Sequence, residues 1–153
     1  MNQHPENDLT ADADFANRRR PEPQTVEELA DSPDPVKVAA ANRASSRQAW
    51  IYLVTVLVGS LVVGLGTLCI TRALDGPLCE AGEATWLCTK TQLYVWAVVA
   101  ALVPFGGLIG CGVIMVKKIN GYLRWRPWMG VFWLLVPVAM TWGLAILQQL
   151  ATA

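Results

Sequence analysis

Residues 92–116 read QLYVWAVVAALVPFGGLIGCGVIMV, a stretch without a charged side chain and with lysines on both sides of it. About 20 apolar residues in a helix cross the hydrocarbon core of a bilayer, so this stretch is long enough to span one. Two further uncharged apolar stretches, residues 50–71 and 128–147, lie before and after it. Soluble helices keep a polar face toward water and rarely show three such stretches in a row. The sequence therefore predicts an all-α membrane protein with three transmembrane helices.

The first 48 residues differ from the rest because they are rich in acids and prolines and contain no glycine. A segment of this composition buries too little apolar surface to offset its chain entropy, so residues 1–48 are expected to form a mostly disordered tail. Thr25 and Glu28 have the spacing of a capping box and predict one short helix. Asp34 and Pro35 suit the first positions of a second helix, which is expected to extend from about residue 36 into the first span.

Small residues recur at helical spacing in the first two spans. Ser60 and Gly64 are four residues apart, as are Gly106 and Gly110, and Gly107 lies beside the second pair. Residues this small let membrane helices approach closely, so that packing replaces the hydrophobic force that lipid removes. We expect the second glycine group to dock on the first span, on the third span or on a partner protein. Residues 49–150 are thus expected to form one three-helix transmembrane domain.

Basic residues gather before the first span and between the second and third spans. They are Lys37, Arg43, Arg47, Lys117, Lys118, Arg124 and Arg126. The loop between the first two spans has basic residues only at its margins. Three spans place the two basic segments on one side of the bilayer, and the positive-inside rule assigns that side to the cytoplasm. The sequence predicts a multi-pass protein of the plasma (inner) membrane with its N-terminus in the cytoplasm and its C-terminus outside.

Cys79 and Cys88 lie in the loop that this orientation places outside. An oxidising exterior favours a disulfide between them, and closing a loop of about ten residues contributes about 2.7 kcal/mol on the entropic model. Two free thiols and a redox-active pair are the alternatives, although redox pairs usually have only two residues between the cysteines. Cys69 and Cys111 fall inside spans, where they resemble small apolar residues.

The segment before the third span interleaves bases with indole rings. Arg124, Trp125, Arg126 and Trp128 are predicted to form an interfacial anchor on anionic lipid, because such side chains prefer the headgroup zone. Stacking of nucleic-acid bases on the aromatic rings is the alternative interpretation. The anchor is preferred, and no nucleic-acid partner is expected.

The spans contain none of the charged groups that ion paths and proton relays normally need. The chain also shows no glycine-rich phosphate loop, no nucleophile elbow and no cluster of metal ligands. We therefore expect no catalytic residue, no cofactor and no metal site, and we expect that the protein is not an enzyme.

The acidic, proline-bearing tail, the Trp-rich spans and the short cysteine loop resemble the small uncharacterised multi-span proteins of actinobacterial plasma membranes. The resemblance covers the general layout of the chain. Low-bulk helix faces, the long tail, and Trp133 and Trp142 deep in the third span favour a non-catalytic accessory or assembly subunit of a larger complex. Its expected partners are the lipid bilayer and other membrane subunits or further copies of itself. The alternatives are a small self-associating permease or transporter component and an extracytoplasmic thiol-redox protein that uses Cys79 and Cys88.

Overall fold

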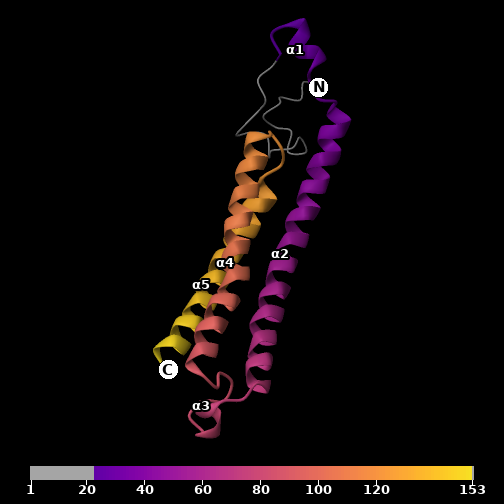
Figure 1. Ribbon diagram of the computed structural model, residues 1–153. Coiled ribbons are helices and arrows are strands. Elements are labelled where there is room, and N and C mark those ends of the chain that lie inside the picture. The colour runs from indigo at the N-terminus through magenta and orange to yellow at the C-terminus, as the bar shows by residue number, and fades with distance from the viewer. Residues whose placement is uncertain (1–22, 153) are drawn as a thin grey trace, which may run out of the picture.

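The computed structural model describes residues 23–152, and every regular element in that range is a helix (Figure 1). Two helices are short and three are long. In chain order they are α1 Val26–Ala30, α2 Pro35–Ala73, α3 Pro77–Glu80, α4 Lys90–Asn120 and α5 Arg126–Ala151. The all-α fold with three long helices is thus confirmed. The disorder predicted for the tail falls largely on residues 1–22, which lie outside the described residues.

Both helices at the N-terminal end begin at the caps that the sequence predicts. The Thr25 hydroxyl accepts a hydrogen bond from the Glu28 amide at 3.2 Å, which starts α1. The Asp34 carboxylate accepts one from the Val36 amide at 2.9 Å, which starts α2. From there α2 continues for 39 residues. At about 1.5 Å per residue it is roughly twice as long as the ~30 Å hydrocarbon core, so its first part projects beyond the bilayer.

The three long helices are each long and apolar enough to cross a membrane. The predicted spans, residues 50–71, 92–116 and 128–147, fall inside α2, α4 and α5 respectively. Large apolar side chains cover the outward faces of all three helices. Apolar patches of this extent need lipid rather than water as their solvent. The chain is therefore a membrane-spanning protein.

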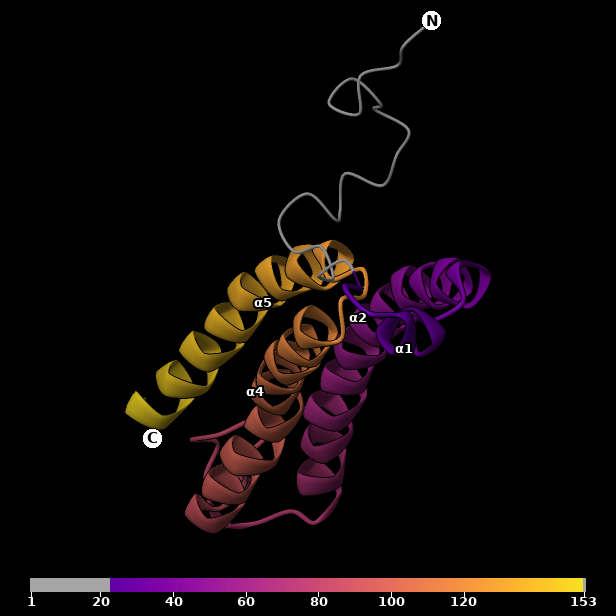
Figure 2. The same cartoon turned by 90° about the horizontal axis from the view of Figure 1, so that it is seen from above.

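The core of the bundle lies along α4, which packs against both α2 and α5 (Figure 2). Two clusters of buried residues fill it, one toward each end. The cluster near the α4–α5 loop comprises Ala49, Leu53, Val56, Cys111, Trp128, Val131 and Leu135. The cluster near the α2–α4 loop comprises Leu87, Leu93, Trp96, Ala97, Ala100 and Ile146.

Glycines let α4 approach α2 closely. A Cβ atom added to Gly107 would lie 2.6 Å from a methyl carbon of Val56, and one added to Gly110 would lie 2.6 Å from the hydroxyl oxygen of Tyr52. That hydroxyl donates a hydrogen bond to the carbonyl of Gly107 at 2.8 Å. Gly107 and Gly110 are therefore the part of the predicted glycine group that lies against the first span.

Gly64 marks the place where all three long helices meet. A Cβ atom added to it would lie 2.5 Å from the indole ring of Trp142 on α5. The indole N–H of Trp96 on α4 donates a hydrogen bond to the Gly64 carbonyl at 3.1 Å. Ser60, one turn earlier, is also buried and donates to the carbonyl of Val56 at 2.7 Å. The predicted Ser60–Gly64 face thus points into the bundle.

Gly106 lies outside this packing, on an exposed part of the α4 surface. A Cβ atom added to it would meet no other atom within 4 Å. The GxxxG pair predicted as one surface is consequently divided, with Gly110 facing α2 and Gly106 facing outward. Within the chain, the docking surface of α4 follows the spacing of Gly107 and Gly110 instead.

This packing yields a stability prediction for a matched pair of variants. Gly107→Ala places its new methyl group against Val56, and overpacking of this kind lowers the free energy of unfolding by about 1–3 kcal/mol. Gly106→Ala places the same methyl group in open space, so its free energy of unfolding should not fall. Denaturant unfolding in detergent micelles measures both values. An equal loss of stability in the two variants would contradict the described orientation of α4.

Candidate functional site

Hydrogen bonds join α2 to the α4–α5 loop at one end of the bundle. The side-chain oxygen of Asn42 accepts from the backbone N–H of Arg124 at 2.9 Å, and the Ser45 hydroxyl donates to the backbone carbonyl of Arg124 at 2.9 Å. Asn42 and Ser45 are both buried. Two side chains of α2 therefore satisfy both backbone groups of one loop residue, which fixes the loop to the helix.

Trp128 belongs to the same group of contacts. Its indole N–H donates to the Ser45 hydroxyl at 3.1 Å, and its ring centroid lies 5.5 Å from that of Tyr52. We call Asn42, Ser45, Arg124 and Trp128 together the polar clasp. Buried indoles usually donate their N–H to an acceptor, and Ser45 on the facing helix is the acceptor for Trp128.

The four residues predicted as an interfacial anchor do not share one environment. Arg126 is exposed and Arg124 and Trp125 are half-buried, but Trp128 is only 3% exposed. Trp128 lies in the first turn of α5, where its ring turns toward α2 rather than toward lipid. The prediction is therefore corrected for Trp128, which is a core residue and not part of a headgroup anchor.

The polar clasp also brings the two basic segments of the chain to the same end of the bundle. It ties the part of α2 before the first span to the α4–α5 loop. Basic residues lie on both partners: Lys37, Arg43, Arg47, Lys117, Lys118, Arg124 and Arg126. We call this end of the bundle the basic end. The α2–α4 loop lies at the opposite end (Figure 1).

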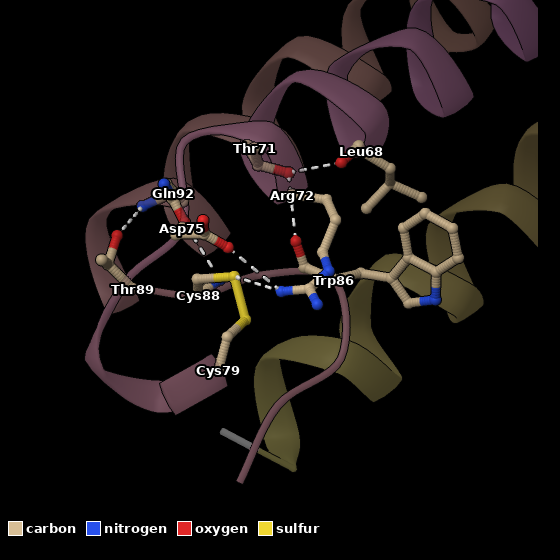
Figure 3. Close-up of a disulfide and its surroundings, with 9 residues drawn as sticks. All are labelled: Leu68, Thr71, Arg72, Asp75, Cys79, Trp86, Cys88, Thr89 and Gln92. Carbon is tan, nitrogen blue, oxygen red and sulfur yellow. Dashed lines mark hydrogen bonds and ion pairs between the residues drawn. A yellow bond between two sulfur atoms is a disulfide. The ribbon is translucent and has the colours of Figure 1, made fainter. Parts of the chain in front are cut away.

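The α2–α4 loop is closed by a disulfide between Cys79 of α3 and Cys88, whose Cα atoms are 4.8 Å apart (Figure 3). The amide of Leu78 also donates a hydrogen bond to the Cys88 carbonyl at 3.1 Å. The predicted disulfide is confirmed. Because covalent and backbone contacts coincide, the loop has a defined shape and is not merely an extended connection.

Further hydrogen bonds hold this loop against the two helices that it connects. The Thr71 hydroxyl of α2 donates to the Trp86 carbonyl at 3.3 Å. The side-chain oxygen of Gln92 on α4 accepts from the Cys88 amide at 2.9 Å (Figure 3). Cys88 itself is buried. The disulfide therefore lies in a segment that is bonded to both neighbouring helices.

One charged group lies close to the disulfide. The Arg72 guanidinium is 3.8 Å from the Cys88 sulfur and 3.4 Å from the Asp75 carboxylate (Figure 3). A cation beside a cysteine stabilises the thiolate that forms on reduction. The remaining cysteines are free: Cys69 is exposed and Cys111 is buried. Among residues 23–152, no group of three or more His, Cys, Asp or Glu residues is placed to hold a metal ion.

Comparisons with known proteins assign no role to these residues. No protein-family model, no curated protein and no solved structure matches this chain. The sequence analysis missed Asn42 and Ser45. Their only signal was two polar residues three apart in an alanine-rich part of α2, and that spacing does not reveal that a loop 79 residues away would cover them.

The polar clasp predicts different effects for two adjacent serines. Ser45→Ala removes the partner of both the Trp128 indole and the Arg124 carbonyl, and unpaired buried groups cost about 1–3 kcal/mol. Ser46→Ala is the matched control, because its hydroxyl bonds only to the Asn42 carbonyl within α2. We expect the free energy of unfolding, measured in detergent micelles, to fall for Ser45→Ala and to change by less than about 0.5 kcal/mol for Ser46→Ala. Equal values would show that the polar clasp contributes nothing to stability.

Proposed function

We propose that this chain is a non-catalytic integral protein of the plasma (inner) membrane that serves as an accessory or assembly subunit of a larger complex. The observation that carries this proposal is the outward face of α4. There Gly106 lies open between Leu102 and Ile109, which are 64% and 68% exposed. A glycine between bulky lipid-facing side chains leaves a shallow depression in the helix surface, where the backbone of a partner helix can approach closely.

The outward face of α5 supports the same proposal. Trp142 packs inside the bundle against Gly64, but Trp133 is 65% exposed. Tryptophan is among the residues most enriched at the centres of protein interfaces, because its ring contributes a large rigid contact area. An outward tryptophan on one helix and an open glycine on another offer two features for recognition by other membrane helices.

For orientation, we propose that the basic end faces the cytoplasm. The polar clasp brings both basic segments to one end, and the positive-inside rule assigns such an end to the cytoplasmic side. The disulfide at the other end fits an oxidising exterior. The C-terminus would then lie outside, as α5 runs away from the basic end.

Two other functions use the same features differently. In a small self-associating permease or transporter component, a second copy of the chain would occupy the open face at Gly106. In an extracytoplasmic thiol-redox protein, Arg72 beside the Cys88 sulfur would support a reactive Cys79–Cys88 pair. The experiments below distinguish both alternatives from an accessory subunit.

The proposed orientation predicts which thiols a membrane-impermeant maleimide reaches from outside intact cells. Without a reductant, neither Cys79 nor Cys88 should react, because each sulfur is bonded to the other. After mild reduction, Cys79 should become labelled, because it is only partly buried, whereas Cys88 and Cys111 should not, because both are fully buried. Mass spectrometry of the labelled peptides gives the result. Labelling only after the cells are opened would place the loop in the cytoplasm and reverse the orientation.

The proposed function predicts that purification in mild detergent recovers unrelated membrane subunits together with this chain. Gly106→Leu should reduce their recovery severalfold, because the side chain fills the place where a partner helix approaches. Gly66→Leu is the matched control, since a Cβ atom at that position also enters open space but on α2, which carries neither of the two proposed recognition features. Quantitative mass spectrometry measures the recovered proteins.

The outcomes of this purification separate the three functions. Recovery of copies of this chain alone, lost in Gly106→Leu, would favour the self-associating component. The double variant Cys79→Ser, Cys88→Ser should keep its partners if the disulfide only shapes the loop. Equal recovery of unrelated subunits with Gly106→Leu and Gly66→Leu would contradict a role for the outward face of α4.

A further inference from the structure

An open groove of about 400 Å³ lies between α2 and α4 at the basic end. Its volume falls within the range of about 300–1,000 Å³ that is usual for small-molecule sites. Its lining comes from both helices and the first turn of α5: Gln48, Ile51, Tyr52, Thr55, Ile114, Lys118 and Trp128. Neither the disulfide loop nor the open face at Gly106 contributes to it.

Two aromatic rings give the groove a fixed wall. Tyr52 is held by its hydrogen bond to the Gly107 carbonyl at 2.8 Å, and Trp128 by its hydrogen bond to Ser45 at 3.1 Å. The two rings pack against each other with centroids 5.5 Å apart. Because both side chains are anchored in the core, the groove is formed before any ligand arrives, which lowers the entropic cost of binding.

Polar and apolar side chains are sorted along the groove. Gln48 and Lys118 face each other at one end, with the Lys118 ammonium 3.5 Å from the Gln48 side-chain oxygen. Ile51 and Ile114 lie further along the two helices, on the side of the apolar spans. The Thr55 hydroxyl donates its hydrogen bond to the Ile51 carbonyl within α2. The groove therefore crosses the boundary between the headgroup zone and the hydrocarbon core.

The charge at the polar end is positive. Arg47 precedes Gln48 and Lys117 precedes Lys118, while neither α2 nor α4 contains an acid. The nearest acid before Gln48 along the chain is Asp34, about 20 Å away at 1.5 Å per helical residue. That distance exceeds the Debye length of about 8 Å at physiological ionic strength. A ligand with a net negative headgroup is therefore complementary to this end.

We propose that the groove binds one anionic phospholipid. Its phosphate contacts the Lys118 ammonium in place of Gln48, and one acyl chain lies along Ile51, Thr55 and Ile114. Basic pockets between membrane helices are known places for anionic headgroups. The groove adds to that charge an apolar part that continues toward the bilayer. The headgroup therefore meets the basic end of the groove, and the acyl chain meets its apolar part.

The test uses the full chain, purified in a mild non-ionic detergent and titrated with phosphatidylglycerol or with phosphatidylcholine carrying the same acyl chains. Native mass spectrometry counts the lipids bound. We expect one phosphatidylglycerol to bind at least about fivefold more tightly than phosphatidylcholine, the preference that one cation near a headgroup supplies. Lys118→Gln should remove this preference.

Two further variants keep the proposal falsifiable. Lys117→Gln removes the same charge from outside the groove and should lower phosphatidylglycerol affinity less than about twofold. Ile114→Trp fills the apolar part and should weaken both lipids while the unfolding free energy stays near that of the unchanged protein. Equal effects of Lys117→Gln and Lys118→Gln would overturn the proposal in favour of non-specific attraction. Competition by inorganic phosphate as strong as that by the lipid, or a second copy of the chain in place of lipid, would also overturn it.

Discussion

The close approach of α2 and α4 at Gly107 is the contact on which the rest of the structure depends. Lipid is as apolar as the helices, so association cannot rely on the hydrophobic effect and needs close packing and hydrogen bonds. Gly107 supplies both, because its missing side chain admits Val56 and its carbonyl accepts the Tyr52 hydroxyl. That bond fixes the Tyr52 ring against Trp128, and Trp128 in turn joins the start of α5 to α2 through Ser45.

The two ends of the bundle are closed by different chemistry. At the basic end, buried side chains of α2 satisfy the backbone of the α4–α5 loop. At the other end, a disulfide shapes the loop, which accepts a hydrogen bond from Thr71 of α2 and donates one to Gln92 of α4. Both ends of the bundle are therefore fixed by bonds between its helices and its loops.

Three surfaces differ enough in character to serve different contacts. The outward side of α4 offers an open glycine, and α5 offers an exposed tryptophan, both in the apolar zone where another helix would lie. The groove beside Lys118 lies instead between α2 and α4 at the basic end. A subunit that holds a partner helix on one side and an anionic lipid on another would couple assembly of a complex to the composition of its membrane.

The sequence by itself determined the properties that depend on composition along the chain. The length of the uncharged apolar stretches predicted the three spans. Thr25 and Asp34 predicted where two helices begin, and Cys79 and Cys88 predicted the disulfide that closes the α2–α4 loop. These signals are local. A span depends on the composition of one segment, a helix cap on residues two or three positions apart, and the disulfide on a short loop.

Only the tertiary structure decided which side of each helix faces inward. Successive helical residues point about 100° apart, so a rotation of α4 by about that angle would exchange Gly106 and Gly107 between lipid and core. The neighbouring helices set that rotation, through Val56 and Tyr52. For the same reason, the sequence predicts Trp128 to be a headgroup anchor, whereas in the fold it is a core residue. Its indole N–H donates a hydrogen bond to Ser45, which is 83 residues away in the chain.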